Sequence, residues 1–154
     1  MQVIDRRHSN ERGVLDMGMK NSGFSDEQKR MARLKNVYPK VMDECCKNIA
    51  LELYRTAKKN TPVDSGTLKR GWVLTPPVRE GLTFTAVVSN NVEYGPHVEY
   101  GHRLVRRDSN GTPIYCGYVA GQHFFHHAIS QAQRAQGDLL KAAMAQIKRE
   151  VDGV

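Results

Sequence analysis

The sequence predicts an α+β fold in which an antiparallel β-sheet is flanked by a long N-terminal helix and C-terminal helices, with a protruding hairpin or loop. Apolar residues recur every three or four positions over residues 31–57 and again over 124–151, which is typical of helices. Between these segments, residues 82–89 alternate apolar and polar side chains, which is typical of a strand.

The first helix is expected to begin at Ser25 and to end before Pro62. Ser25 is a good N-cap residue, and the acidic residues that follow it would suit the positive end of the helix dipole. Pro39 lacks the backbone N–H that a helix interior uses, so a kink or a split near Tyr38 is expected.

The chain has 154 residues, which suits one domain. Residues 1–25 are polar and without a sustained period, so we expect a flexible N-terminal arm followed by a single α+β domain over residues 26–151. The net charge of +7 favours an acidic partner, but solvated basic faces would explain it equally well.

The cysteines and the apolar segments of the sequence indicate the cellular compartment in which the protein folds. The three cysteines, Cys45, Cys46 and Cys116, are too few and too poorly spaced for a disulfide framework or a zinc ribbon, which indicates reduced thiols. Neither a secretory leader nor an apolar run of about 20 residues is recognisable. We therefore expect folding in the cytosol and no membrane partner.

Turn residues divide the middle of the chain. Pro62, Asp64 and Gly66 form a turn cluster after the first helix, and Trp72 opens a strand over residues 71–78. Pro76 and Pro77 are expected to end that strand or to confine it to a sheet edge. Glu80 and Gly81 favour a hairpin turn into the strand over residues 82–89.

The second half is expected to contain a short helix, a hairpin and further helices. Pro96 suits the first turn of a short helix that ends near Gly101, and residues 102–120 form a long loop or hairpin about a turn at residues 108–111. The remainder is expected to form two helices, over residues 122–136 and 137–151, or one helix broken at Gly137.

The sequence gives little support for a metal site or a catalytic site. His123 and His127 lie four residues apart on a predicted helix, a spacing that can hold one metal ion, but no acidic residue accompanies them. Helix-start or interface histidines explain them better. No nucleophile elbow and no phosphate-binding glycine loop occur. We therefore expect no enzyme activity, no catalytic residue, no cofactor and no metal site.

Two predicted surface features favour binding to a nucleic acid or to another protein subunit. Arg103, Arg106 and Arg107 on the predicted hairpin, with tyrosines beyond them, could meet phosphates. A solvated basic hairpin is at least as good an interpretation. Tyr94 and Tyr100 are amphipathic and suit an interface, although they could equally cover the edge of the sheet within one monomer.

Three motifs resemble a known family in order and spacing. The segment TPVDSGTLKRGW at residues 61–72 resembles the family's TPVDTG-x-L-R-x-S-W signature. NVEYGPHVEYG at residues 91–101 is similar to N-x-x-E-Y-A-x-Y-V-E-Y-G, and GQHFFHHAI at residues 121–129 is similar to G-Q-P-F-L-R-P-A-L. The family is that of gene-product-ten-like minor tail, or neck, components of long-tailed double-stranded DNA phages. The resemblance covers roughly residues 26–150, and the chain departs from it at His123 and His127, where prolines are usual, and at Gly95, where alanine is common.

The resemblance implies a non-enzymatic virion protein for tail completion at the head–tail junction, made in the host cytoplasm. It implies a homo-oligomeric ring, six- or twelve-fold by family analogy, around the DNA channel between the portal–adaptor assembly and the tail tube or terminator. Its partners would be those proteins and the genomic duplex in the lumen. The alternatives are a basic nucleic-acid-binding protein or nuclease, and a metal-dependent enzyme at the histidine cluster.

The site residues predicted on this basis fall into two groups. Those expected at subunit or ring contacts are Tyr94, His97, Glu99, Tyr100, Arg103, Arg106 and Arg107. Those expected to form a structural turn are Pro62, Asp64, Gly66 and Trp72.

Overall fold

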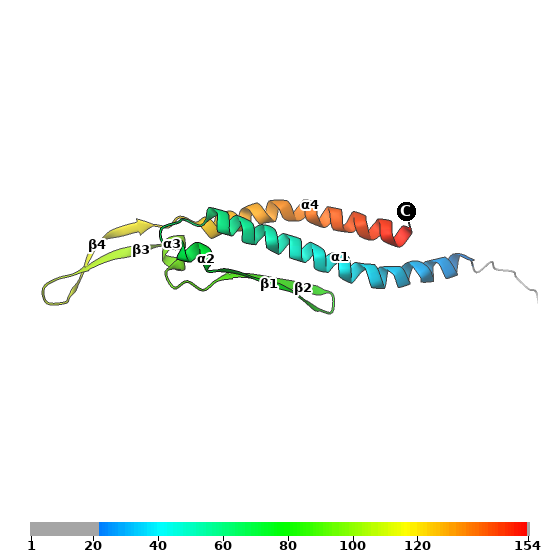
Figure 1. The fold of residues 1–154 in the computed structure, drawn as a ribbon, viewed down its shortest axis with the longest axis horizontal. Coiled ribbons are helices and arrows are strands. Elements are labelled where there is room, and N and C mark those ends of the chain that lie inside the picture. Colours follow the sequence, from blue (N-terminus) through cyan, green and yellow to red (C-terminus); the bar gives the residue numbers. More distant parts are fainter. Residues whose placement is uncertain (1–21, 154) are drawn as a thin grey trace, which may run out of the picture.

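A computed structural model describes residues 22–153 of the protein. Two long helices run antiparallel, one β-hairpin lies along the first helix, and a second hairpin projects from one end (Figure 1). The elements, in chain order, are α1 (Ser22–Asn60), α2 (Thr67–Arg70), β1 (Trp72–Glu80), β2 (Thr83–Asn90), α3 (Gly95–Tyr100), β3 (Gly101–Arg107), β4 (Pro113–Ala120) and α4 (Phe124–Asp152).

Helix α1 begins earlier than the sequence predicted, at Ser22 instead of Ser25. The acidic residues Asp26 and Glu27 therefore do not occupy the first turn. They pair instead with Lys29 at 3.3 Å and Arg30 at 3.0 Å, three residues further along the exposed helix surface. Of the predicted N-terminal arm, the part from residue 22 onward is helical, and residues 1–21 lie outside the described residues.

Of the kink or split expected near Tyr38, the split is wrong, because α1 continues through Pro39 as one helix. A proline removes one backbone hydrogen bond of the helix. Its neighbours Val37, Tyr38 and Val41 pack in a hydrophobic cluster with α4. Burial of these side chains outweighs the missing bond, since most helix stability in proteins comes from packing of the apolar face.

The predicted break at Gly137 is also wrong, because α4 is one helix from Phe124 to Asp152. Gly137 lies on the exposed side, while Leu139 and Leu140 beside it pack against α1. A glycine inside a helix costs only about 1 kcal/mol relative to alanine, less than burying one leucine side chain contributes. Asp138 thus lies in mid-helix, where it pairs with Lys141 at 3.5 Å.

Two hydrophobic clusters hold the long helices together, and the apolar stripes predicted from the sequence supply both. One cluster, along the C-terminal half of α4, is centred on Val41, Cys45, Ala143 and Ile147. The other, at the hairpin end, contains Ala57, Leu68, Trp72, Phe124 and Ala128. Ala57 and Ala128 are fully buried, and their small side chains allow α1 and α4 to approach closely.

The α+β class is confirmed, but the strands form two separate antiparallel pairs instead of one sheet. Strands β1 and β2 pair from Trp72 opposite Asn90 to Glu80 opposite Thr83, with an irregularity between Thr75 and Val78. Two prolines lie at that irregularity, consistent with the predicted edge position. The pair rests on α1, and β2 turns its partly buried residues inward as the alternation predicted, apart from the exposed Leu82 in the turn.

Candidate assembly interface

The turn after α1 is held by Thr61. Its hydroxyl donates a hydrogen bond to the Ala57 carbonyl at 2.6 Å and accepts one from the indole N–H of Trp72 at 2.8 Å. Both residues are buried. The Trp72 ring packs against Phe125, with the ring centroids 5.0 Å apart, and meets Phe124 edge-on at 6.4 Å. Trp72 thus joins the end of α1, the start of β1 and the start of α4.

The predicted turn residues lie beside one of the predicted interface tyrosines. Gly66 precedes α2 in a left-handed conformation with φ of 76°, which favours glycine. Pro62, Asp64 and Gly66 line a surface depression of about 540 Å³ together with Tyr94. The structure therefore brings the first two sequence motifs together on one surface.

Glu99 differs from the other predicted contact residues because it is buried and its carboxylate is used within the chain. Its two oxygens accept hydrogen bonds from the backbone N–H groups of Phe125 at 2.9 Å and His126 at 3.0 Å. These amides belong to the first turn of α4, where N–H groups lack partners within the helix. Glu99 therefore caps α4 from α3 and offers no free surface to a neighbour.

Three histidines, His123, His126 and His127, lie at the start of α4. His123 precedes the helix with φ of 50°, and its ring lies 6.5 Å from that of Tyr100. The rings of His126 and His127 are 6.2 Å apart. Within residues 22–153, no group of three or more His, Cys, Asp or Glu side chains is placed to hold a metal ion.

The projecting hairpin, residues 101–120, is fixed at its base by close backbone contacts. Gly101 has φ of 84°, and a Cβ atom there would collide with the carbonyl of Val119. A Cβ atom at Gly121 would collide with the carbonyl of Glu99. The Tyr118 hydroxyl donates a hydrogen bond to the Tyr100 carbonyl at 2.7 Å. The base is therefore tightly packed, although the strands extend away from the helices (Figure 1).

The register of the projecting hairpin gives it two different faces, because directly opposed residues in a ladder share a face. Arg103 lies opposite Tyr118, and Val105 lies opposite Tyr115. His102 lies opposite Val119, and Arg106 lies opposite Ile114. We call the first the basic-aromatic face, comprising Arg103, Val105, Arg107, Tyr115 and Tyr118. We call the second the aliphatic face, comprising His102, Leu104, Arg106, Ile114 and Val119.

The remaining predicted contact residues are all on the surface. Tyr94 is 42% exposed and Tyr100 is 67% exposed, so covering the sheet edge does not bury them. His97 is exposed on α3, with its ring 5.6 Å from that of His102. The three arginines are exposed along β3, and Arg107 donates a hydrogen bond to the Gly111 carbonyl at 3.0 Å.

A family model described as "Bacteriophage HK97-gp10, putative tail-component" matches residues 26–101. Over this segment the chain is similar to the HK97-gp10-like family. The match covers α1, the turn held by Trp72, the β1–β2 pair and α3, and it ends where β3 begins. The comparison with curated proteins and the comparison with solved structures gave no match.

Similarity to the HK97-gp10-like family is consistent with a tail component of a bacteriophage and with a virion protein that contacts other virion proteins. Within the described residues, no helix is both long enough and apolar enough to cross a membrane.

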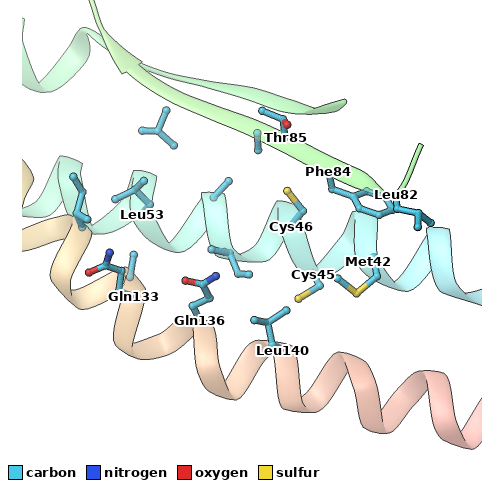
Figure 2. Close-up of a pocket in the computed structure, with 16 residues that line it drawn as sticks. Met42, Cys45, Cys46, Leu53, Leu82, Phe84, Thr85, Gln133, Gln136 and Leu140 are labelled. Carbon is cyan, nitrogen blue, oxygen red and sulfur yellow. The ribbon is translucent and has the colours of Figure 1, made fainter. Parts of the chain in front are cut away.

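Two features of the structure were not predicted from the sequence. The capping role of Glu99 depends on a contact across 26 residues, which local patterns do not reveal. The second feature is an apolar trough of about 510 Å³ between α1, α4 and β2 (Figure 2). Its lining contains no charged side chain and includes Met42, Cys46, Leu53, Leu82, Phe84, Val88, Ile129, Gln136 and Leu140.

Proposed function

We propose that the protein is a structural, non-enzymatic subunit of the phage neck that completes the tail. It assembles as a homo-oligomeric ring around the DNA channel at the head–tail junction, between the portal–adaptor assembly and the tail tube. The observation that carries the proposal is the HK97-gp10-like match over residues 26–101, in which the turn and α3 present exposed residues on one surface. Assembly would take place in the host cytoplasm before the ring enters the virion.

The exposed surface supports an assembling subunit. A two-stranded hairpin is marginally stable alone, and the projecting hairpin exposes six large apolar side chains. They are Leu104, Val105, Ile114, Tyr115, Tyr118 and Val119, each between 41% and 63% exposed. Exposed apolar groups gathered in one element are typical of a protein interface. A ring requires a heterologous contact that closes, and elements that project from one end of a subunit suit such a contact.

The location of the protein tests this proposal. Cryo-electron microscopy of particles, made in cells that express the chain with its neighbouring virion proteins, is expected to show a ring of this fold at the head–tail junction. Intact particles without it would contradict the proposal.

Substitutions at Tyr94, which precedes α3, and at Tyr100, its last residue, test the contact surface. Tyr94→Ala and Tyr100→Ala are expected to leave the monomer folded, because both side chains are exposed, and to lower the yield of tailed particles. Glu93→Ala, also exposed in the same segment, is the matched control and is expected to assemble normally. Normal particle yield with both tyrosine variants would contradict the assignment of this surface.

One observation favours a second function, contact with nucleic acid. The basic-aromatic face places Arg103 and Arg107 beside two exposed tyrosines, a combination that suits phosphates and bases. In a ring, this face could line the DNA channel. Binding of the isolated chain to short duplex DNA would then weaken as salt is raised, and Arg103→Gln with Arg107→Gln would reduce the salt dependence by about two phosphate contacts. Affinity unchanged by salt would exclude this function.

A further inference from the structure

Two apolar surfaces of this chain lack a partner within the described residues, and they differ in shape. The trough between α1, α4 and β2 is an open depression whose lining carries no charge. Figure 2 shows Phe84 and Leu82 on its sheet side, Cys46 on α1, and Gln136 and Leu140 on α4. The aliphatic face of the projecting hairpin is a raised ribbon with Leu104 and Ile114 about half exposed.

One copy cannot bring these two surfaces together. The projecting hairpin leaves the body at the end opposite the chain's C-terminus, whereas the trough lies along the middle of α1 (Figures 1 and 2). The close contacts of Gly101 and Gly121 fix the direction of the hairpin at its base. A partner for each surface must therefore come from another molecule.

The dimensions of the two surfaces agree. Along α1 the trough extends from Met42 to Leu53, which corresponds to roughly 16 Å at the rise of a helix. The aliphatic face extends from His102 to Arg106, which corresponds to roughly 13 Å at the rise of a strand. Strand β2 borders the trough and pairs only with β1 in the described structure.

The charges agree as well. Arg106 is the one arginine on the aliphatic face. Burial raises the pKa of the trough-lining Cys46 thiol, and the charge of the nearby, exposed Asp43 raises it further. An arginine at the rim of an inserted hairpin would meet an acidic group there. Such a pair would offset part of the repulsion between copies that each carry a net charge of +7.

We propose that the aliphatic face of the projecting hairpin docks in the apolar trough of a second copy of this chain. The contact is heterologous, so each copy gives a hairpin to one neighbour and receives one from another. This deepens the proposed ring, on which it rests, by naming the surfaces that join its subunits.

Self-association of the full-length purified chain tests the proposal by sedimentation equilibrium. Leu104→Asp, on the aliphatic face, is expected to weaken association at least about tenfold. Val105→Asp, the adjacent residue on the opposite face, is the matched control and should associate like the unmodified chain. On the trough side, Leu82→Asp should weaken association and Val87→Asp, which lies outside the trough lining, should not. All four positions are exposed, so the monomer should stay folded.

Cross-linking tests which surfaces meet. A variant that retains only Cys116 is mixed with a Cys116→Ala variant that retains the trough cysteines, and a short bismaleimide is added. A cross-linked dimer is expected in the mixture and absent from either variant alone. A dimer within one variant alone would indicate a symmetric contact and overturn the proposal. A chain that stays monomeric, or equal effects of Leu104→Asp and Val105→Asp, would also overturn it.

Deletion of residues 1–21 tests the other possible occupant of the trough, this chain's own N-terminal segment. If deletion exposes Cys46 to alkylation while Leu104→Asp has no effect on association, the trough belongs to that segment and the proposal fails. None of these outcomes tests the proposed role in the phage tail, which depends on whether the protein is found in particles.

Discussion

The carboxylate of Glu99, in α3, accepts a hydrogen bond from the backbone N–H of Phe125, in the first turn of α4, at 2.9 Å. Its other oxygen accepts a bond from His126 at 3.0 Å. One side chain thus satisfies two amides that the helix leaves unpaired, and a carboxylate there suits the helix dipole. The chain between these partners is the projecting hairpin, so Glu99 locks the two ends of that hairpin to the body.

Replacing Glu99 by alanine is expected to destabilise the protein by about 2 kcal/mol, because two part-buried amides of the first turn of α4 lose their charged acceptor. Urea unfolding followed by circular dichroism measures the change. Glu93→Ala, on an exposed side chain in the same motif, should stay within about 0.5 kcal/mol of the unmodified chain. Equal stability of the two variants would show that water caps α4 as well as Glu99 does.

The bond between Trp72 and Thr61 is expected to couple these two residues energetically. Thr61→Val removes the acceptor for the indole N–H, and Trp72→Phe removes the donor. A double-mutant cycle should give a coupling of about 1 kcal/mol. Thr61→Val leaves the buried indole N–H without an acceptor, whereas Trp72→Phe leaves the Thr61 hydroxyl with its bond to the Ala57 carbonyl alone. Strict additivity of the two changes would mean that the bond contributes nothing to stability.

Gly101→Ala is expected to cost about 3 kcal/mol or to prevent folding of the hairpin base. Its φ of 84° is unfavourable for alanine, and the added Cβ would meet the Val119 carbonyl. Gly81 also has a positive φ, 63°, but open space around it, so Gly81→Ala is the control and should cost only about 1 kcal/mol. Thermal unfolding compares the two, and similar costs would contradict the collision at Gly101.

The trough cysteines are expected to make the protein less stable in alkaline solution. Burial raises the pKa of the Cys45 and Cys46 thiols above the ordinary value. Because the unfolded chain loses these protons first, their contribution is complete below the unfolded thiol pKa and is lost as pH rises through the folded value. Unfolding free energy measured from about pH 7.5 to about pH 10 should fall less steeply for Cys46→Ala than for the unmodified chain. The exposed Cys116 provides the control, since Cys116→Ala should keep the unmodified slope.

Much of this fold follows from local patterns in the sequence. The stripe from Leu34 to Ala57 and the stripe from Phe124 to Val151 both pack where their spacing predicted. The alternation in β2 and the turn at residues 108–111 were also correct. These features depend on residues close in sequence, and periodicity reports them directly.

The two wrong helix breaks share one physical cause, which is that tertiary packing outweighs a local breaker. Pro39 and Gly137 each reduce helix stability, but each lies beside side chains that are buried between α1 and α4. The role of Glu99 was missed for a related reason, since a carboxylate in a tyrosine-rich motif gives no sign that it will cap a helix beyond a whole hairpin. Long-range contacts of this kind become visible only once the elements are placed.

Gly137 permits a test of that balance. It lies on the exposed side of α4, in helical conformation, with nothing near enough to obstruct a Cβ atom. Gly137→Ala should therefore stabilise the protein by about 0.5–1 kcal/mol, because alanine loses less backbone freedom on folding. The higher free energy of unfolding should appear as a higher midpoint of urea unfolding, with the dependence of that free energy on urea concentration unchanged. A lower midpoint would mean that α4 needs a flexible point at residue 137, and the break expected from the sequence would then exist in solution.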